Sequence, residues 1–259
     1  MKINSKEVTG VFIGKNYVRK IRLGSNLAYS RDYGYEFSQD TTTGEGFYSV
    51  IGRGTYTGKK LIYPNTHNDG VHGEHKVTRI LSCGVSNDFD NVFTTVVIPE
   101  NITFMRGRNS SQSGALCGLN YVTEIKFNAI DCIISGLGDV FGDCGRLTSG
   151  ATLTIGKKVK KIPQLLFRNY YKDYYRVPNV TSIIFEDNSE CESIGQYAFG
   201  ELPFVGKIVI PKSVTTIGLN AFPNSNNFTI YCEASSKPEG WSDYWATGNP
   251  NVVWGYTGD

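Results

Sequence analysis

All three histidines of this 259-residue chain fall within one short polar segment, NTHNDGVHGEHKV. His67, His72 and His75 are interleaved there with Asp69 and Glu74. Imidazole and carboxylate groups this close together could bind zinc or a similar ion if the loop closed around it. The histidines lack the regular spacing of a metal-binding helix, so the alternative is a solvated loop. We expect no metal and no cofactor, with these histidines as weak candidates only.

A second segment is rich in tyrosine and arginine, a composition typical of recognition surfaces. The stretch FRNYYKDYYRVPNV spans residues 167–180, and helical spacing would place tyrosines four residues apart on one side. Tyrosine offers a large contact area and a hydroxyl group while losing little conformational entropy. The alternative is that two of the tyrosines only pack against the neighbouring part of the fold. The predicted contact residues are Arg168, Tyr170, Tyr171, Tyr174, Tyr175 and Arg176.

Sequence signatures of catalysis are missing. The chain contains no G-x-S-x-G, no H-E-x-x-H and no G-x-x-x-x-G-K-[ST] pattern. A pair of glycosidase carboxylates is defined in space and not in sequence, so a hydrolase stays as a distant alternative. We predict that the protein is not an enzyme.

The composition favours strands and turns. Glycine (29), tyrosine (16) and phenylalanine (14) are abundant. The net charge is +2 with scattered lysine and arginine, so we predict no nucleic-acid partner. No run approaches 18 consecutive apolar residues, so we predict no membrane span. The six cysteines form no C-x-x-C pair, and we interpret them as small, reduced core residues and not as disulfides or metal ligands.

Short apolar strands recur along the chain, and their last members are separated by 29, 28, 30, 25 and 20 residues. Such a period predicts a solenoid, because one unit cannot bury its own apolar face and must stack on its neighbours. Each middle strand is followed by another apolar position and then by a bulky pair. The strands are 96–98, 125–127, 153–155, 183–185, 208–210 and 228–230. The later positions are Ile133 or Ile134, Ile162, Ile194 and Ile217, and the pairs are Val140-Phe141, Leu166-Phe167, Ala198-Phe199 and Ala221-Phe222.

A basic run and an acidic stretch occupy corresponding turns of adjacent repeats. GKKVKKIP spans residues 156–163, and FEDNSECES spans residues 185–193. We expect them to form a ladder of surface ion pairs that contributes little to stability.

The sequence of the repeats resembles the BspA-type (Treponema-type) leucine-rich repeats of bacterial surface proteins. Residues 208–222, IVIPKSVTTIGLNAF, match the family pattern almost position for position. SIGQYAF (193–199) and VFGDCGRL (140–147) match in part. The resemblance implies a β-rich fold, mostly β with short helical turns: a leucine-rich-repeat solenoid of about six or seven repeats.

The ends of this solenoid resemble the family's caps, at residues 46–66 and 231–256. Aromatic residues in the second cap could form a platform for stacking sugars. Because a solenoid end must be covered and large aromatics do this well, we expect them to cap the core instead. These residues are Trp241, Trp245, Trp254 and Tyr256.

A different repeat opens the chain. EVTGVFIGKN (7–16) and YVRKIRLGSN (17–26) align at a period of ten, with GKN and GSN as hairpin turns. This segment resembles a small β-module at the start of phage and prophage virion proteins. We therefore predict a β-module over residues 1–30, a polar linker or arm over residues 31–44, and the capped solenoid over residues 45–257.

The N-terminal segment has no apolar stretch of the kind that a secretory signal peptide needs. This favours release by lysis, and the alternative is a leader that preceded Met1. The resemblances imply a phage or prophage virion component that docks to other virion subunits through residues 1–30 and displays the solenoid to a host-surface glycan or protein. The alternatives are a bacterial cell-surface adhesin and a structural protein that cements capsid or tail subunits. The sequence does not decide whether the protein forms a homo-oligomer.

Overall fold

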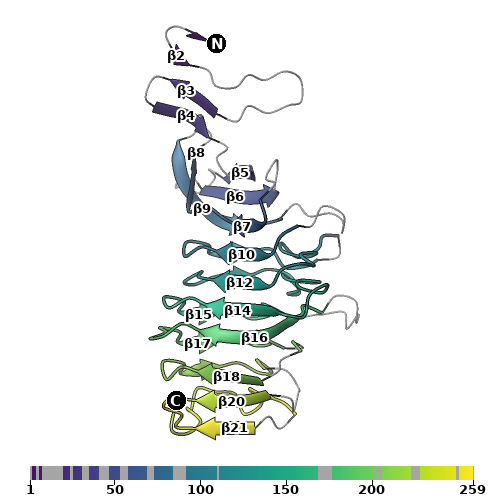
Figure 1. The fold of residues 1–259 in the computed structure, drawn as a ribbon. Helices are drawn as coiled ribbons and strands as arrows, with labels where there is room; N and C mark the ends of the chain where they lie inside the picture. The colour runs from purple at the N-terminus through teal and green to yellow at the C-terminus, as the bar shows by residue number, and fades with distance from the viewer. Residues whose placement is uncertain are drawn as a thin grey trace.

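The chain winds into a column of stacked coils (Figure 1). The computed structural model describes residues 2–3, 6–7, 20–23, 26–30, 35–40, 47–52, 58–68, 73–83, 92–109, 111–168, 177–200, 202–203, 206–222, 228–248 and 251–258. Across these residues it contains strands and turns and no helix, so the predicted short helical turns are non-helical here. The structure confirms the predicted β-rich repeat solenoid.

Parallel strands form one side of the column. The five-stranded sheet contains β7 (Lys60–Ile62), β10 (Thr95–Ile98), β12 (Glu124–Phe127), β14 (Ala151–Ile155) and β16 (Val180–Phe185). A three-stranded sheet follows it, with β18 (Gly206–Ile210), β20 (Phe228–Cys232) and β21 (Asn251–Trp254). The register places Ile98, Phe127 and Ile155 in one row, so equivalent repeat positions stack directly.

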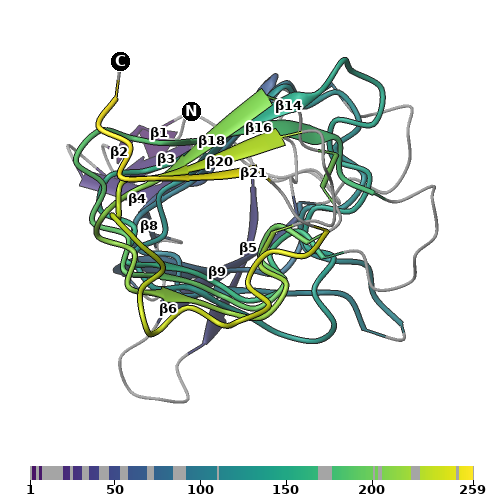
Figure 2. The ribbon, with the colours of Figure 1, turned by 90° about the horizontal axis from the view of Figure 1, so that it is seen from below.

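The opposite side carries a second set of strands (Figure 2). Here β6 (Phe47–Gly52), β9 (Glu74–Ile80), β11 (Phe104–Met105) and β13 (Ile133–Ile134) run parallel, and β8 (Thr66–Asn68) pairs antiparallel with β9. Further along lie β15 (Lys161–Ile162), β17 (Ser193–Ile194) and β19 (Thr216–Ile217). Ile162, Ile194 and Ile217 align in register, and Trp241 continues the row through a bridge to Ile217.

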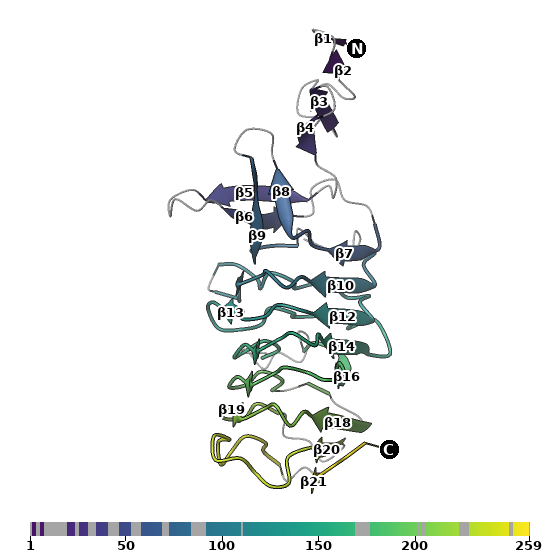
Figure 3. The same cartoon turned by 90° about the vertical axis from the view of Figure 1, so that its left-hand side faces the viewer.

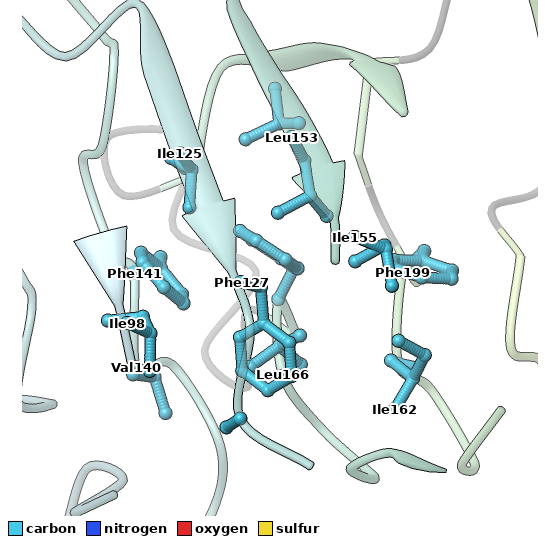
Figure 4. Packing of buried hydrophobic residues seen from close by; sticks show 14 of the residues in the cluster. Ile98, Ile125, Phe127, Val140, Phe141, Leu153, Ile155, Ile162, Leu166 and Phe199 are labelled. Carbon is cyan, nitrogen blue, oxygen red and sulfur yellow. The ribbon is translucent and has the colours of Figure 1, made fainter. Parts of the chain in front are cut away.

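The predicted bulky pairs supply a continuous row of aromatic rings inside the column, which we call the aromatic spine. The ring centroids of Phe141 and Phe167 lie 4.7 Å apart, and those of Phe167 and Phe199 lie 6.4 Å apart. The row continues from Phe199 to Phe222 (5.4 Å) and from Phe222 to Trp245 (5.7 Å). Figure 4 shows part of this packing, including Phe141 and Phe199. All five rings are buried, so the spine joins consecutive coils through their centre.

A left-handed turn precedes each pair of the spine. Asp139, Leu165, Tyr197 and Asn220 have φ values of 55°, 64°, 52° and 49°, and each stands one residue before the pair. For leucine and tyrosine this conformation costs about 1–2 kcal/mol. The turn lets the backbone bond to the next coil: the Leu165 N–H, for example, donates to the Gln196 carbonyl at 2.9 Å.

Glycines in the repeat wording SIG and TIG allow adjacent coils to approach closely. The Gly195 N–H donates to the Ile162 carbonyl of the preceding coil at 2.9 Å. A Cβ at Gly195 would lie 2.4 Å from the backbone nitrogen of Gln164, and one at Gly218 would lie 2.5 Å from that of Gln196. Neither contact is sterically allowed, so these glycines are required by the spacing between coils.

The N-terminal strands lie beyond the first coil (Figure 3). β1 (Lys2–Ile3) and β2 (Lys6–Glu7) form one antiparallel pair, and β3 (Lys20–Leu23) and β4 (Asn26–Ser30) form another. Leu23 stands opposite Asn26, as expected for a hairpin at GSN, whereas GKN lies outside the described residues. The boundary at residue 30 stays a prediction.

Part of the segment predicted as a linker belongs to the folded column. β5 (Glu36–Asp40) lies inside residues 31–44 and pairs antiparallel with β6. Tyr35 is buried, and Phe37 packs against the core. Because the segment is mostly polar, it was predicted as a linker. Its aromatic residues nevertheless lie two positions apart and give a strand one apolar side to bury.

We predict that Gly195→Ala lowers the free energy of unfolding by about 1–3 kcal/mol, because the added methyl group meets backbone and cannot be accommodated by a rotamer change. Denaturant titration followed by circular dichroism measures the loss. Gly200→Ala is the control, since its Cβ would meet nothing nearer than 3.4 Å; we expect it to stay within about 1 kcal/mol of the parent. Equal stability of the two variants would contradict close approach of the coils at Gly195.

Candidate binding surfaces

Most of the predicted tyrosine–arginine contact residues lie outside the described part of the chain, namely Tyr170, Tyr171, Tyr174, Tyr175 and Arg176. Arg168, which precedes them, is described and half-buried. Its guanidinium carbon lies 4.3 Å from the centroid of the Tyr197 ring. The Asn220 side-chain amide donates to the Tyr197 hydroxyl at 3.2 Å. Arg168 therefore joins a row of polar and aromatic residues that runs over three coils.

The histidine segment forms part of the packing at the N-terminal end of the solenoid. His67 is 9% exposed, and its ring stacks on Phe37 with centroids 3.9 Å apart. It also meets the edge of Tyr48 at 4.7 Å, and it stands opposite His75 across β8 and β9. His72 lies outside the described residues. Over the residues that the structure describes, no group of three or more His, Cys, Asp or Glu side chains could hold a metal ion.

All six cysteines are free thiols, and all but the half-buried Cys117 are buried. Burial raises the pKa of Cys132, Cys191 and Cys232 to about 12, and burial together with nearby Asp139 raises that of Cys117 to about 12. Burial also raises the pKa of Cys144 far above its usual value. These five thiols are therefore protonated at neutral pH and are poor nucleophiles. The predicted core positions are confirmed for the five buried cysteines.

The tryptophans close the C-terminal end of the core. Trp241 and Trp245 are buried, with ring centroids 4.8 Å apart, and Trp254 lies 5.5 Å from Trp241. The Trp241 indole N–H donates to the Val214 carbonyl at 3.1 Å. The buried rings of Trp241 and Trp245 are not available as a sugar platform, so the capping prediction is confirmed for these two, and the half-buried Trp254 packs against them. Tyr256 instead lies on the outside, against Tyr231.

The predicted ladder of surface ion pairs is present. Lys160 lies 3.1 Å from Glu190 and 3.4 Å from Glu192 of the next coil, and hydrogen bonds to these carboxylates raise its pKa above 10.5. The pairing therefore acts fully below pH 10.5 and is lost as the pH rises through the raised pKa. Because these groups are exposed, salt screens them and they contribute little at neutral pH.

One hollow lies on the outer face of β9, β11 and β13, with a volume of about 1040 Å³. The Arg79 guanidinium carbon lies 4.3 Å from the Phe104 ring centroid and 5.7 Å from that of Phe47. Ile133 at its edge is 62% exposed, whereas its neighbour Ile134 is buried and fills the core position. An exposed isoleucine beside stacked arginine and phenylalanine is typical of contact surfaces.

A second hollow, of about 660 Å³, lies on the outer face of β16 and β18 and extends to the C-terminal segment. We call it the strand-gap hollow. Its lining combines the exposed Ile184 with Lys207 and Tyr256 and with the carboxylates of Glu186 and Glu233. The site is not evident in the sequence because its residues come from three separate repeats, and no single segment carries a recognisable pattern.

Comparison with known proteins bears on the repeats. The sequence model of the BspA type leucine rich repeat region (6 copies) matches residues 170–238, which are 69 of the 259 residues. This supports the repeat type that the wording of residues 193–222 predicts. No curated protein sequence matches the chain.

Two solved structures resemble the chain at low identity. One is a leucine rich cell surface protein from Faecalibacterium prausnitzii A2-165, with 20% identity and a TM-score of 0.41; the match covers 82% of this chain and 56% of that one. The other is the pneumococcal vaccine antigen PcpA, with 17% identity and a TM-score of 0.48, covering 80% and 51%. The chain thus spans about half the length of these two proteins. Such distant likeness does not bear on function.

Proposed function

We propose that the chain is a non-enzymatic binding protein of the bacterial cell surface, an adhesin built on BspA-type leucine-rich repeats. The main support is the column itself, whose core is continuous from coil to coil and covered by aromatic residues at both ends, while the outer faces of its sheets remain exposed. The repeat match over residues 170–238 supports the same proposal. In the described residues no helix is long and apolar enough to cross a membrane.

A stacked column suits adhesion because its core and its surface are separate. Inward positions hold the coils together, so outward side chains and loops can differ without unfolding the protein. The outer faces on both sides of the column carry apolar groups that a partner could cover. These are the exposed isoleucines Ile62, Ile133 and Ile184.

No comparison supports the virion interpretation, which was drawn from the sequence of the N-terminal segment. Docking to other virion subunits through that segment stays a prediction.

The location is tested on intact cells of the bacterium that produces the protein. We expect antibodies raised against the purified chain to label these cells, and external protease to remove the label, because an adhesin must face outward. A cytoplasmic protein of the same bacterium is the control for lysis. Detection only in particles released by lysis would contradict the surface location and favour the virion.

We further propose that the tyrosine–arginine segment contributes contacts to a host-surface protein or glycan. The change is Tyr170→Ala, Tyr171→Ala, Tyr174→Ala and Tyr175→Ala together, and the measurement is saturable binding of the labelled chain to cells of candidate hosts. We expect affinity to fall about tenfold or more, as for loss of an interface hot spot. The control changes Tyr121 and Tyr244 to alanine, which are 43% and 67% exposed. Unchanged binding by the quadruple variant would contradict a role for this segment.

A further inference from the structure

The strand-gap hollow occurs where the regular stacking of the first sheet is interrupted. β16 is the last strand of the five-stranded sheet and β18 begins the three-stranded one, and over the described residues no ladder joins them. On the opposite side the same two coils remain paired, with Ser193 beside Thr216 and Ile194 beside Ile217. Over the described residues, the coils are thus joined by a strand ladder on one side only, and on the other side a hollow of about 660 Å³ lies over β16 and β18. This volume lies within the range of small-molecule sites.

The polar groups at the rim of the hollow are held in place by the backbone. A Glu186 carboxylate oxygen accepts the Lys157 backbone N–H at 2.9 Å, and a Glu233 carboxylate oxygen accepts the Lys212 backbone N–H at 2.8 Å. The Ser213 hydroxyl donates to the Ser189 carbonyl at 2.9 Å. Side chains fixed in this way lose little conformational entropy when a ligand binds, which favours recognition.

An aromatic and cationic cluster flanks the hollow near the C-terminal end. The rings of Tyr231 and Tyr256 lie 4.7 Å apart, and the Lys207 ammonium lies 5.9 Å and 5.8 Å from their centroids. Lys207 and Tyr256 also line the hollow itself. The site therefore offers an ammonium donor and a phenol beside an apolar surface supplied by Ile184 and Val209.

The charges of the lining narrow the class of ligand. Three carboxylates, from Glu186, Asp187 and Glu233, stand beside two ammonium groups, from Lys207 and Lys212. An anionic ligand would be repelled by the carboxylates, and a cationic ligand would be repelled by the lysines. The hollow therefore does not favour a ligand of either net charge. A purely apolar ligand would leave these groups without water or partners. The lining suits a neutral molecule with many groups that both donate and accept hydrogen bonds.

We propose that the strand-gap hollow binds a neutral oligosaccharide. Sugar hydroxyls donate to the carboxylates and accept from the ammonium groups of Lys207 and Lys212. The C–H faces of the sugar rings cover Ile184, Val209 and the edge of Tyr256. This inference deepens the proposed binding function by naming a ligand class. Its test uses the purified chain alone, so a failure here leaves the surface location standing, and a failure of surface labelling leaves sugar binding standing.

The chain offers a closely matched control. Ile184 and Ile62 are 50% and 46% exposed and occupy the same row of the first sheet, linked in register through Val97, Lys126 and Thr154. Only Ile184 lines the hollow. Ile184→Arg fills the hollow with a charged side chain, and Ile62→Arg makes the same change at an equivalent position far along the column. Tyr256→Ala is a second test that removes a side chain from the wall.

The experiment is isothermal titration calorimetry of the full chain with maltotriose, cellotriose and N-acetylchitotriose, each up to about 10 mM. We expect at least one trisaccharide to bind. Ile184→Arg and Tyr256→Ala should weaken that binding about tenfold or more, while Ile62→Arg leaves it unchanged. Circular dichroism confirms that each variant is folded.

Three results would overturn the proposal. The first is that no trisaccharide binds. The second is that binding persists in Ile184→Arg, which would place the sugar elsewhere. The third is that an unstructured peptide binds in competition with the sugar and more tightly, which would assign the hollow to a protein partner.

Discussion

No single coil of this protein can bury its own apolar residues, and the rest of the structure depends on that constraint. Each coil from Phe141 onward contributes one ring to the aromatic spine, and every coil adds apolar side chains to the rows of the sheets. These side chains are covered only when the next coil stacks on top. The first and last coils have a neighbour on one side only, so their apolar residues must be covered in another way. Trp241 and Trp245 cover the last coil, and Tyr35, Tyr48 and His67 pack beneath the first.

Close stacking of the coils requires some residues to adopt unfavourable backbone conformations. The left-handed turn before each pair places Leu165 and Tyr197 in a conformation that L-residues avoid, and it recurs because it directs the next two side chains into the core. Where the chain comes nearest to the preceding coil, only glycine fits, as at Gly195. Hydrogen bonds between coils on several sides offset these costs. Exposed side chains of the outer faces, such as Ile62 and Ile133, do not fill the core, so they can differ without unfolding the column.

Spacing alone predicted the core, because apolar residues that recur at a fixed period must share one interior. The rows of Ile194 and Ile217 and the ring of Phe199 were read correctly for this reason. The left-handed turns at Leu165 and Tyr197 were not predictable, since leucine and tyrosine rarely adopt this conformation, whereas Asp139 and Asn220 are of residue types that do. β5 was missed because Phe37, its one aromatic residue, is surrounded by polar neighbours. The strand-gap hollow was missed because Ile184, Lys207 and Tyr256 meet only after three repeats have stacked.

A double-mutant cycle measures whether the coils stabilise one another through the aromatic spine. Phe141→Leu and Phe167→Leu are made singly and together, and the free energy of unfolding is measured for each; the rings are stacked 4.7 Å apart. We expect a coupling energy of about 0.5–1.5 kcal/mol for this pair. For Phe141 and Phe222, which are separated by two rings of the spine, we expect additive effects. Additive effects for Phe141 and Phe167 would show that the spine does not couple the coils.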